Sequence, residues 1–226
     1  EADEMLSKIF LNQIYDIFRF LPQEIQVALF SATMTNEFFT LTKRFMRNPT
    51  QILLKKNELT LEGIKQFYVN IGHHDFKYDC LCDLFEIISV SQTMIYCNSK
   101  KSVTDLVERL TKDEFSVLMM HGDMTQEERN EIMGKFRSGE GRIMVATDLL
   151  ARGIDIQQIS IVLNYDLPNS IENYIHRIGR SGRFGRKGTA INFVTDMDFK
   201  KIEEIQQFYS TQIEELPTKT ALSNLL

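Results

Sequence analysis

An arginine-rich segment near residue 180 carries the side chains best suited to binding phosphate. Residues 176–186 read HRIGRSGRFGR. Arg177, Arg180 and Arg183 recur every three residues, so a helical turn would place them on one broad face. Guanidinium groups pair with phosphate oxygens, and the interleaved glycines would end the helix and let backbone approach a ligand. A solvated basic helix end is the alternative for an isolated cluster, but the glycines favour a phosphate site.

A second candidate lies at residues 146–155, which read ATDLLARGID. Thr147 and Arg152 could each bond a backbone phosphate. Gly153 would permit close approach, and Asp155 could accept a hydrogen bond from a ribose hydroxyl. A helix cap followed by a turn accounts for the same residues equally well, so both interpretations stay open.

A third group follows residue 120. Thr125 and Glu128 have the spacing of a capping box that begins a helix. Gln126 and Arg129 would then share a face beside the loop at residues 122–123, an arrangement that the cap does not explain. The segment at residues 31–33 (SAT) precedes a helix and is either a simple cap or part of a site.

The elements that would position these groups alternate along the chain. Short runs that are apolar on both faces indicate buried parallel strands, and amphipathic segments between them indicate helices. Repeated alternation predicts an α/β fold with a doubly wound parallel sheet and helices on both faces. The predicted strands are residues 27–30, 51–54, 65–71, 93–96, 116–120, 142–146, 160–164 and 190–194. The predicted helices include residues 75–88, 101–112, 125–136 and 171–178.

The candidate groups follow predicted strands, where open parallel sheets bind ligands. Asn98 and Ser99 follow one strand, Gly122 and Asp123 the next, and Thr147 a third. A fourth strand leads through a loop to the helix that carries His176. We expect all four loops to form one extended binding surface.

The polar stretch at residues 57–63 predicts a linker. It would separate an incomplete first domain, residues 1–56, from a second domain, residues 64–226. The first piece supplies two predicted strands and too little apolar surface to stand alone.

Bulk composition limits the function. The 226 residues carry a net charge of −5, which argues against a general nucleic-acid coat but allows a local basic surface. Three cysteines without C-x-x-C spacing indicate reduced thiols of an intracellular protein, and neither a disulfide frame nor a zinc site. The sequence has no apolar run long enough to span a membrane and no signal-peptide pattern, so we expect no membrane association.

Together these motifs resemble the DEAD-box RNA helicases, and within that family the initiation factor 4A subgroup. The related exon-junction-complex helicase remains possible. The resemblance covers nearly the whole chain and implies a RecA-like fold. Its motifs are residues 1–6 (EADEML), 31–33, 59–68, 120–124, 147–155, 164–168 (NYDLP) and 174–188, with residues 209–217 typical of the subgroup.

The resemblance implies a role for each matching residue. Glu1 would polarise the attacking water and Asp3 would hold the Mg²⁺ shell. Residues that would couple hydrolysis to domain closure are Ser31, Thr33 and His176. Residues that would line the RNA backbone are Asn98, Ser99, Gly122, Asp123, Gln126, Arg129, Thr147 and Arg152. Gly153 and Asp155 would touch the nucleotide sugar, and Arg180 and Arg183 the γ-phosphate.

The implied cofactors are ATP and Mg²⁺. The implied partners are single-stranded or short-duplex RNA, bound independently of sequence, and a scaffold protein of translation initiation in the cytoplasm, with the nucleus possible. Two departures from the family pattern matter: Ser99 replaces a frequent threonine, and no G-x-x-x-x-G-K-[ST] loop occurs. We therefore expect the chain to be a fragment that is inactive alone.

Two further functions remain open. The chain could be a non-catalytic module that binds RNA or a partner protein, which ATP hydrolysis with RNA would distinguish. A double-stranded DNA motor of the same fold is the third, and comparing RNA with DNA stimulation would decide it.

Overall fold

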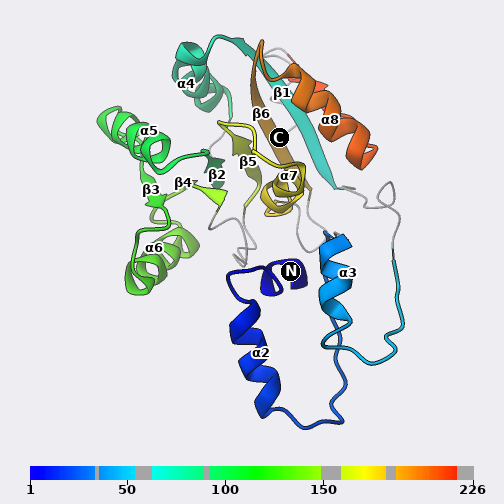
Figure 1. Cartoon of the computed structure of the whole chain (residues 1–226). Helices are drawn as coiled ribbons and strands as arrows, with labels where there is room; N and C mark the ends of the chain where they lie inside the picture. Colours follow the sequence, from blue (N-terminus) through cyan, green and yellow to red (C-terminus); the bar gives the residue numbers. More distant parts are fainter. Residues whose placement is uncertain (34–35, 54–62, 89–91, 149–158, 182–186, 218–226) are drawn as a thin grey trace. The chain divides into compact units, whose positions relative to one another are not determined.

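The computed structural model of the chain describes residues 1–33, 36–53, 63–88, 92–148, 159–181 and 187–217 (Figure 1). These residues form two compact units, Glu1–Leu59 and Thr60–Leu226.

Among the described residues of the first unit, the regular elements are helices joined by irregular segments. Its helices are α1 (Ala2–Met5), α2 (Leu11–Phe20) and α3 (Asn36–Thr42). A small core forms around Ala2, Leu6 and Phe38. The strands expected at residues 27–30 and 51–54 were wrong where the structure describes them, because neither segment gains a strand partner among the described residues. Instead, the Phe30 carbonyl oxygen accepts a hydrogen bond from the Ala2 amide at 3.0 Å.

The second unit is built on one seven-stranded parallel sheet, ordered β3-β4-β2-β5-β6-β1-β7. The strands are β1 (Ile64–Gly72), β2 (Thr93–Tyr96), β3 (Val117–Met120), β4 (Ile143–Ala146), β5 (Ile161–Asn164), β6 (Gly188–Thr195) and β7 (Glu214–Glu215). Every residue of β2, β4 and β5 is buried, which confirms the interpretation of the apolar runs as interior strands.

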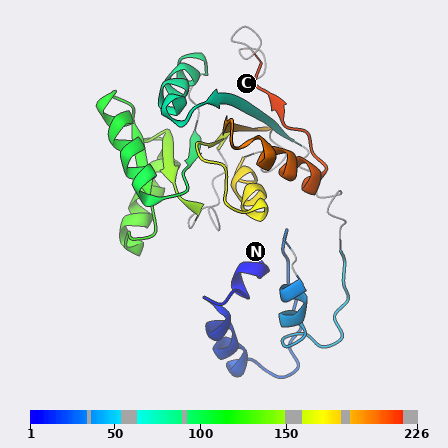
Figure 2. The same cartoon turned by 45° about the horizontal axis from the view of Figure 1, so that its top comes forward.

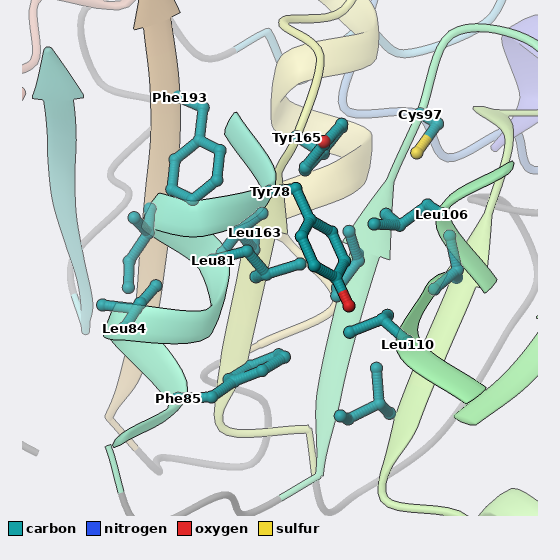
Figure 3. Packing of buried hydrophobic residues seen from close by; sticks show 14 of the residues in the cluster. Tyr78, Leu81, Leu84, Phe85, Cys97, Leu106, Leu110, Leu163, Tyr165 and Phe193 are labelled. Carbon is teal, nitrogen blue, oxygen red and sulfur yellow. The ribbon is translucent and has the colours of Figure 1, made fainter. Parts of the chain in front are cut away.

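Helices cover both faces of this sheet (Figures 1 and 2). They are α4 (Lys77–Ile87), preceded by the 3₁₀ turn η2 (His74–Phe76), then α5 (Lys100–Lys112), α6 (Gln126–Ser138), α7 (Ile171–Ile178) and α8 (Phe199–Tyr209). Helices α4 and α5 pack Leu81, Leu84 and Leu106 against one face, where they meet Leu163 and Phe193 (Figure 3). The doubly wound sheet is confirmed.

Helices α7 and α8 cover part of the other face of the sheet. Side chains alternate between the two faces along each strand. Phe193 of β6 points to α4, whereas its neighbour Asn192 meets Tyr174 of α7. The Tyr209 hydroxyl of α8 donates to the Ile171 carbonyl at 3.0 Å, which joins the two helices.

The four predicted helices of this unit are confirmed to within two residues at each end. The capping box at α6 is also confirmed. The Thr125 hydroxyl accepts from the Glu128 amide at 3.2 Å, and the Glu128 carboxylate accepts from the Thr125 amide at 2.7 Å. The helix ends at Gly139, whose φ of 81° is a conformation that glycine adopts without strain.

Candidate functional site

Three strand ends meet at the guanidinium group of Arg177. This side chain is completely buried. Its Nη2 donates to Asn98 Oδ1 and to Asp148 Oδ2, both at 2.8 Å, and its Nε pairs with the same carboxylate. Its Nη1 donates to Asn164 Oδ1 at 3.1 Å and to the Asp166 carbonyl at 2.6 Å. One arginine therefore joins the ends of β2, β4 and β5 to α7.

The loop after β5 is held by a buried ion pair. Lys77 Nζ lies 2.8 Å from Asp166 Oδ1, and the lysine side chain is 4% exposed. Asp166 Oδ2 accepts from the Asn98 amide at 3.0 Å and from the Ser102 hydroxyl at 3.3 Å. Burial by itself would raise the pKa of the Asp166 carboxyl, but the hydrogen bond and charge of Lys77 outweigh it and lower the pKa. The pair therefore fixes the loop that begins at Asn98.

The Asn98–Ser99 loop is exposed, and its polar groups are oriented by neighbours. Asn98 Nδ2 donates to the Leu167 carbonyl at 2.8 Å. The Ser99 hydroxyl caps α5 by accepting from the Ser102 amide at 3.1 Å. The helix cap and a binding role are compatible, because a hydroxyl that accepts one bond can still donate another.

The loop after β3 presents a second set of exposed groups. Asp123 pairs with Lys100 at the start of α5, and this contact lowers the pKa of the Asp123 carboxyl. Arg129 Nη2 donates to the Gly122 carbonyl, and Gln126 bonds within α6 to Asn130 at 3.0 Å. The structure thus brings Arg129 to this loop, whereas the hydrogen bond of Gln126 lies within α6.

The arginine segment differs from the expectation. Helix α7 ends at Ile178, so Arg180 lies beyond it and does not share a helical face with Arg177. The Arg177 guanidinium group donates hydrogen bonds to other residues of the chain, and its side chain has no exposed surface that a ligand could contact. His176 and Arg180 are both 5% exposed, and Arg180 Nε donates to the His176 carbonyl at 3.0 Å. Fully pairing a buried guanidinium requires many acceptors, and strand-end residues supply them to Arg177.

In the first unit, the Asp3 carboxylate accepts hydrogen bonds from two hydroxyl groups. The Ser31 hydroxyl donates to Asp3 Oδ1 at 2.5 Å, and the Thr33 hydroxyl donates to Oδ2 at 2.6 Å. Glu1 is exposed at the start of α1. A half-buried carboxylate suits the water shell of Mg²⁺, which proteins bind with few carboxylates and substrate phosphates. No cluster of three His, Cys, Asp or Glu capable of holding a metal occurs in the described part of the chain.

Four predicted site residues fall outside the described residues. They are Arg152, Gly153, Asp155 and Arg183. Thr147 is described, and it is half-buried directly after β4.

Sequence reasoning missed Lys77, Asn164 and Asp166. Asn164 and Asp166 had a usable signal, because they are polar residues at the carboxyl end of a predicted strand. Lys77 gave none, since a lysine in an amphipathic helix is normally exposed. The three cysteines are free, and burial raises the pKa of Cys97 to about 12 and that of Cys80 to about 11. Both thiols are therefore protonated near neutral pH and are poor nucleophiles.

Comparison with known proteins places this geometry in a family. Residues 76–185 match the model of the helicase conserved C-terminal domain. The chain is 58% identical over 221 residues to eukaryotic initiation factor 4A of Caenorhabditis elegans, covering 98% of this chain and 55% of that protein. It is 60% identical over 217 residues to the ATP-dependent RNA helicase eIF4A of Meyerozyma guilliermondii, covering 96% and 55%. The chain thus spans about half the length of these relatives.

Solved structures agree. Saccharomyces cerevisiae Dbp5 bound to RNA and ADP BeF3 superimposes with a TM-score of 0.90 at 34% identity, covering 100% of this chain and 60% of that one. The C-terminal domain of the DEAD-box protein Dbp5 gives a TM-score of 0.68 at 34% identity, covering 74% of this chain and all of that one. The fold is RecA-like, and the chain belongs to the DEAD-box family of RNA helicases.

Proposed function

We propose that the parent protein is an RNA-stimulated ATPase of the initiation factor 4A type that unwinds short RNA duplexes during translation initiation. This chain would supply its second RecA-like domain, residues 64–226, and residues 1–56 of its first, joined by a linker at 57–63. The observation that carries the proposal is the convergence of three strand ends on Arg177, which aligns the loops after β2, β4 and β5 along one edge.

That edge is suited to the backbone of a single strand. Amide, hydroxyl and guanidinium groups donate to phosphate and ribose, and such contacts carry little sequence information. Binding should therefore be independent of sequence and sensitive to salt. The proposed RNA contacts are Asn98, Ser99, Gly122, Asp123, Gln126, Arg129, Thr147 and Arg152.

Each nucleotide-binding role is proposed for a residue that matches the family pattern. We assign Gly153 and Asp155 to the sugar, and Arg180 and Arg183 to the γ-phosphate. Such an arginine can be worth about 10³–10⁵ in rate. Asp3 would hold water molecules of the Mg²⁺ shell, and the ion would neutralise charge that develops on the phosphates. Glu1 would orient the attacking water.

Coupling between hydrolysis and domain closure would involve Ser31, Thr33 and His176. The two hydroxyls already bond Asp3, so a change at the metal-binding carboxylate would reach them directly. Domain closure over ATP and RNA would bend one strand and separate a short duplex. Hydrolysis would then release the strand.

The partners that follow from this function are RNA and a scaffold protein of the initiation machinery, in the cytoplasm. None of the helices that the structure describes combines the length and apolarity needed to cross a bilayer. A non-catalytic module that binds RNA or protein is the competing function for this chain alone, because it has no G-x-x-x-x-G-K-[ST] sequence.

Unwinding by the full-length protein tests the proposal. A short RNA duplex should separate with ATP and Mg²⁺, and RNA should stimulate ATP hydrolysis where double-stranded DNA does not. The 226-residue chain should show no hydrolysis above background. Stimulation by DNA alone would support a DNA motor and contradict the proposal.

A further inference from the structure

Two asparagines interrupt the apolar interior of the sheet. Asn164 of β5 and Asn192 of β6 are paired in register on adjacent strands, and neither has any exposed surface. Burying an amide side chain costs free energy unless its donors and acceptor are all paired. A leucine at each position would fill similar space without that cost, so the pair calls for a reason beyond packing.

The two amides continue the bonds of Arg177 into the core. Asn164 Oδ1 accepts from Arg177, and Asn164 Nδ2 donates to Asn192 Oδ1 at 2.8 Å. Asn192 Nδ2 then donates to the Phe67 carbonyl of β1 at 2.8 Å. It also lies 3.3 Å from the Tyr174 hydroxyl oxygen. A line of polar contacts therefore runs from the candidate site through β5 and β6 to β1.

Arg177 determines which atom of each asparagine amide donates a hydrogen bond and which atom accepts one. A guanidinium group only donates, so Asn164 must turn its oxygen toward Arg177 and its NH₂ toward Asn192. Asn192 must in turn accept from Asn164 and donate to Phe67. Each amide is thus locked in one orientation, and the position of Asn164 Oδ1 is set by strands on both sides of it.

The far end of the line serves a different purpose. The Tyr174 hydroxyl donates to Gln66 Oε1 at 2.8 Å, and Gln66 Nε2 donates to the Thr211 hydroxyl at 2.9 Å. These bonds satisfy buried groups of α7 and β1 but do not touch Arg177. They provide an internal comparison, because the same kind of buried hydrogen bond can be removed there without disturbing the arginine.

We infer that Asn164 and Asn192 are positioning residues for RNA binding. They hold the Arg177 guanidinium in place, and Arg177 holds the loops at Asn98 and Asp148. The inference rests on the proposed function, which places RNA contacts in those loops. It does not require either asparagine to touch RNA, and both are buried.

The test is the paired substitution Asn164→Leu/Asn192→Leu in the full-length helicase. The substitution removes both partners of the Asn164–Asn192 bond, but it also takes one acceptor from the buried Arg177 guanidinium and one donor from the Phe67 carbonyl oxygen. We therefore expect a lower thermal midpoint, as in the control variant below. The KM for single-stranded RNA in the ATPase assay should rise about tenfold, the loss typical of one charge-assisted hydrogen bond. The KM for ATP should stay within about twofold.

Tyr174→Phe is the matched control. It removes a buried hydroxyl at the far end of the line, so its thermal midpoint should fall while its KM for RNA stays near that of the wild type. A purely structural role would lower the active fraction and thus kcat, without changing the KM for RNA. An unchanged KM for RNA in the double variant, or an equal rise in Tyr174→Phe, would overturn the inference.

If the double variant does not fold, the single substitution Asn164→Asp tests the inference instead. It keeps an acceptor for Arg177 but loses the donor that fixes this side chain to Asn192, so the thermal midpoint should fall and the KM for RNA should rise. An unchanged KM for RNA in this variant would contradict the inference. All comparisons are made with the wild-type protein, so a wild type without RNA-stimulated hydrolysis would refute the proposed function instead.

Discussion

Arg177 and Asp148 form an ion pair that joins α7 to the end of β4, with Arg177 Nη2 2.8 Å from Asp148 Oδ2. The arginine has no exposed side-chain surface, whereas the aspartate side chain is 26% exposed. A charge buried to this degree is tolerated only when its donors are paired, and here four residues supply acceptors. The pair therefore defines the geometry of the edge where we place RNA.

Arg177→Lys should destabilise the chain despite keeping the charge. An ammonium is a point donor and cannot reach acceptors on four residues as a planar guanidinium does. We expect a loss of about 3 kcal/mol in the free energy of unfolding, measured by urea denaturation. Arg142→Lys, at an exposed position, is the control and should change that free energy by less than about 0.5 kcal/mol. Equal effects of the two substitutions would refute the role of Arg177.

Asp166 should make stability depend on pH in the acid range. Its pKa is lowered in the folded protein, so its contribution is present above the unfolded pKa of about 4 and is lost as the pH falls through the folded pKa. Asp166→Asn removes this titration. The difference in unfolding free energy between wild type and variant should be largest near pH 7 and shrink towards pH 3. Asp105→Asn, which removes a carboxylate at an exposed position, is the control.

Thr33 should matter for unwinding through its hydroxyl group. Thr33→Val keeps the shape but removes the 2.6 Å bond to Asp3, and we expect duplex unwinding by the full-length protein to fall about tenfold. Thr33→Ser keeps the hydroxyl and should retain most of the activity. Unwinding rates of the two variants on one short RNA duplex give the answer, and equal rates would exclude coupling through this bond.

The capping box positions the start of α6, where Gln126 and Arg129 lie. Thr125→Ala should cost about 1 kcal/mol of unfolding free energy, because the Glu128 amide loses its acceptor. Thr125→Ser should cost much less. A urea titration of each variant measures both, and a neutral alanine substitution would show that the cap does not stabilise the helix.

Much of the second unit was predictable from local patterns. Interior parallel strands leave continuous apolar runs, and the Thr125–Glu128 spacing marks a helix start. The expected strands at residues 27–30 and 51–54 failed because an apolar run becomes a strand only beside a partner. Strand β7 was missed because Glu214 and Glu215 are exposed and charged, so only the edge of β1 defines them.

The sequence predicted which edge of the sheet carries the candidate site. It did not predict the hydrogen bonds within that site. Rules for parallel sheets placed the loops at Asn98 and Thr147 together. The three-residue spacing of the arginines suggested one face, whereas Arg177 turns inward to buried acceptors. Burial of an arginine depends on partners far away in the sequence, such as Asn98 and Asp148, and no local pattern shows them.

Arg183→Ala in the full-length protein tests most directly whether this edge serves an RNA-stimulated ATPase. Arg186→Ala is the matched control, since Arg186 lies in the same segment but is not among the residues assigned to the phosphates. RNA-stimulated ATP hydrolysis should be abolished in Arg183→Ala and retained in Arg186→Ala. Normal turnover in Arg183→Ala would contradict the account.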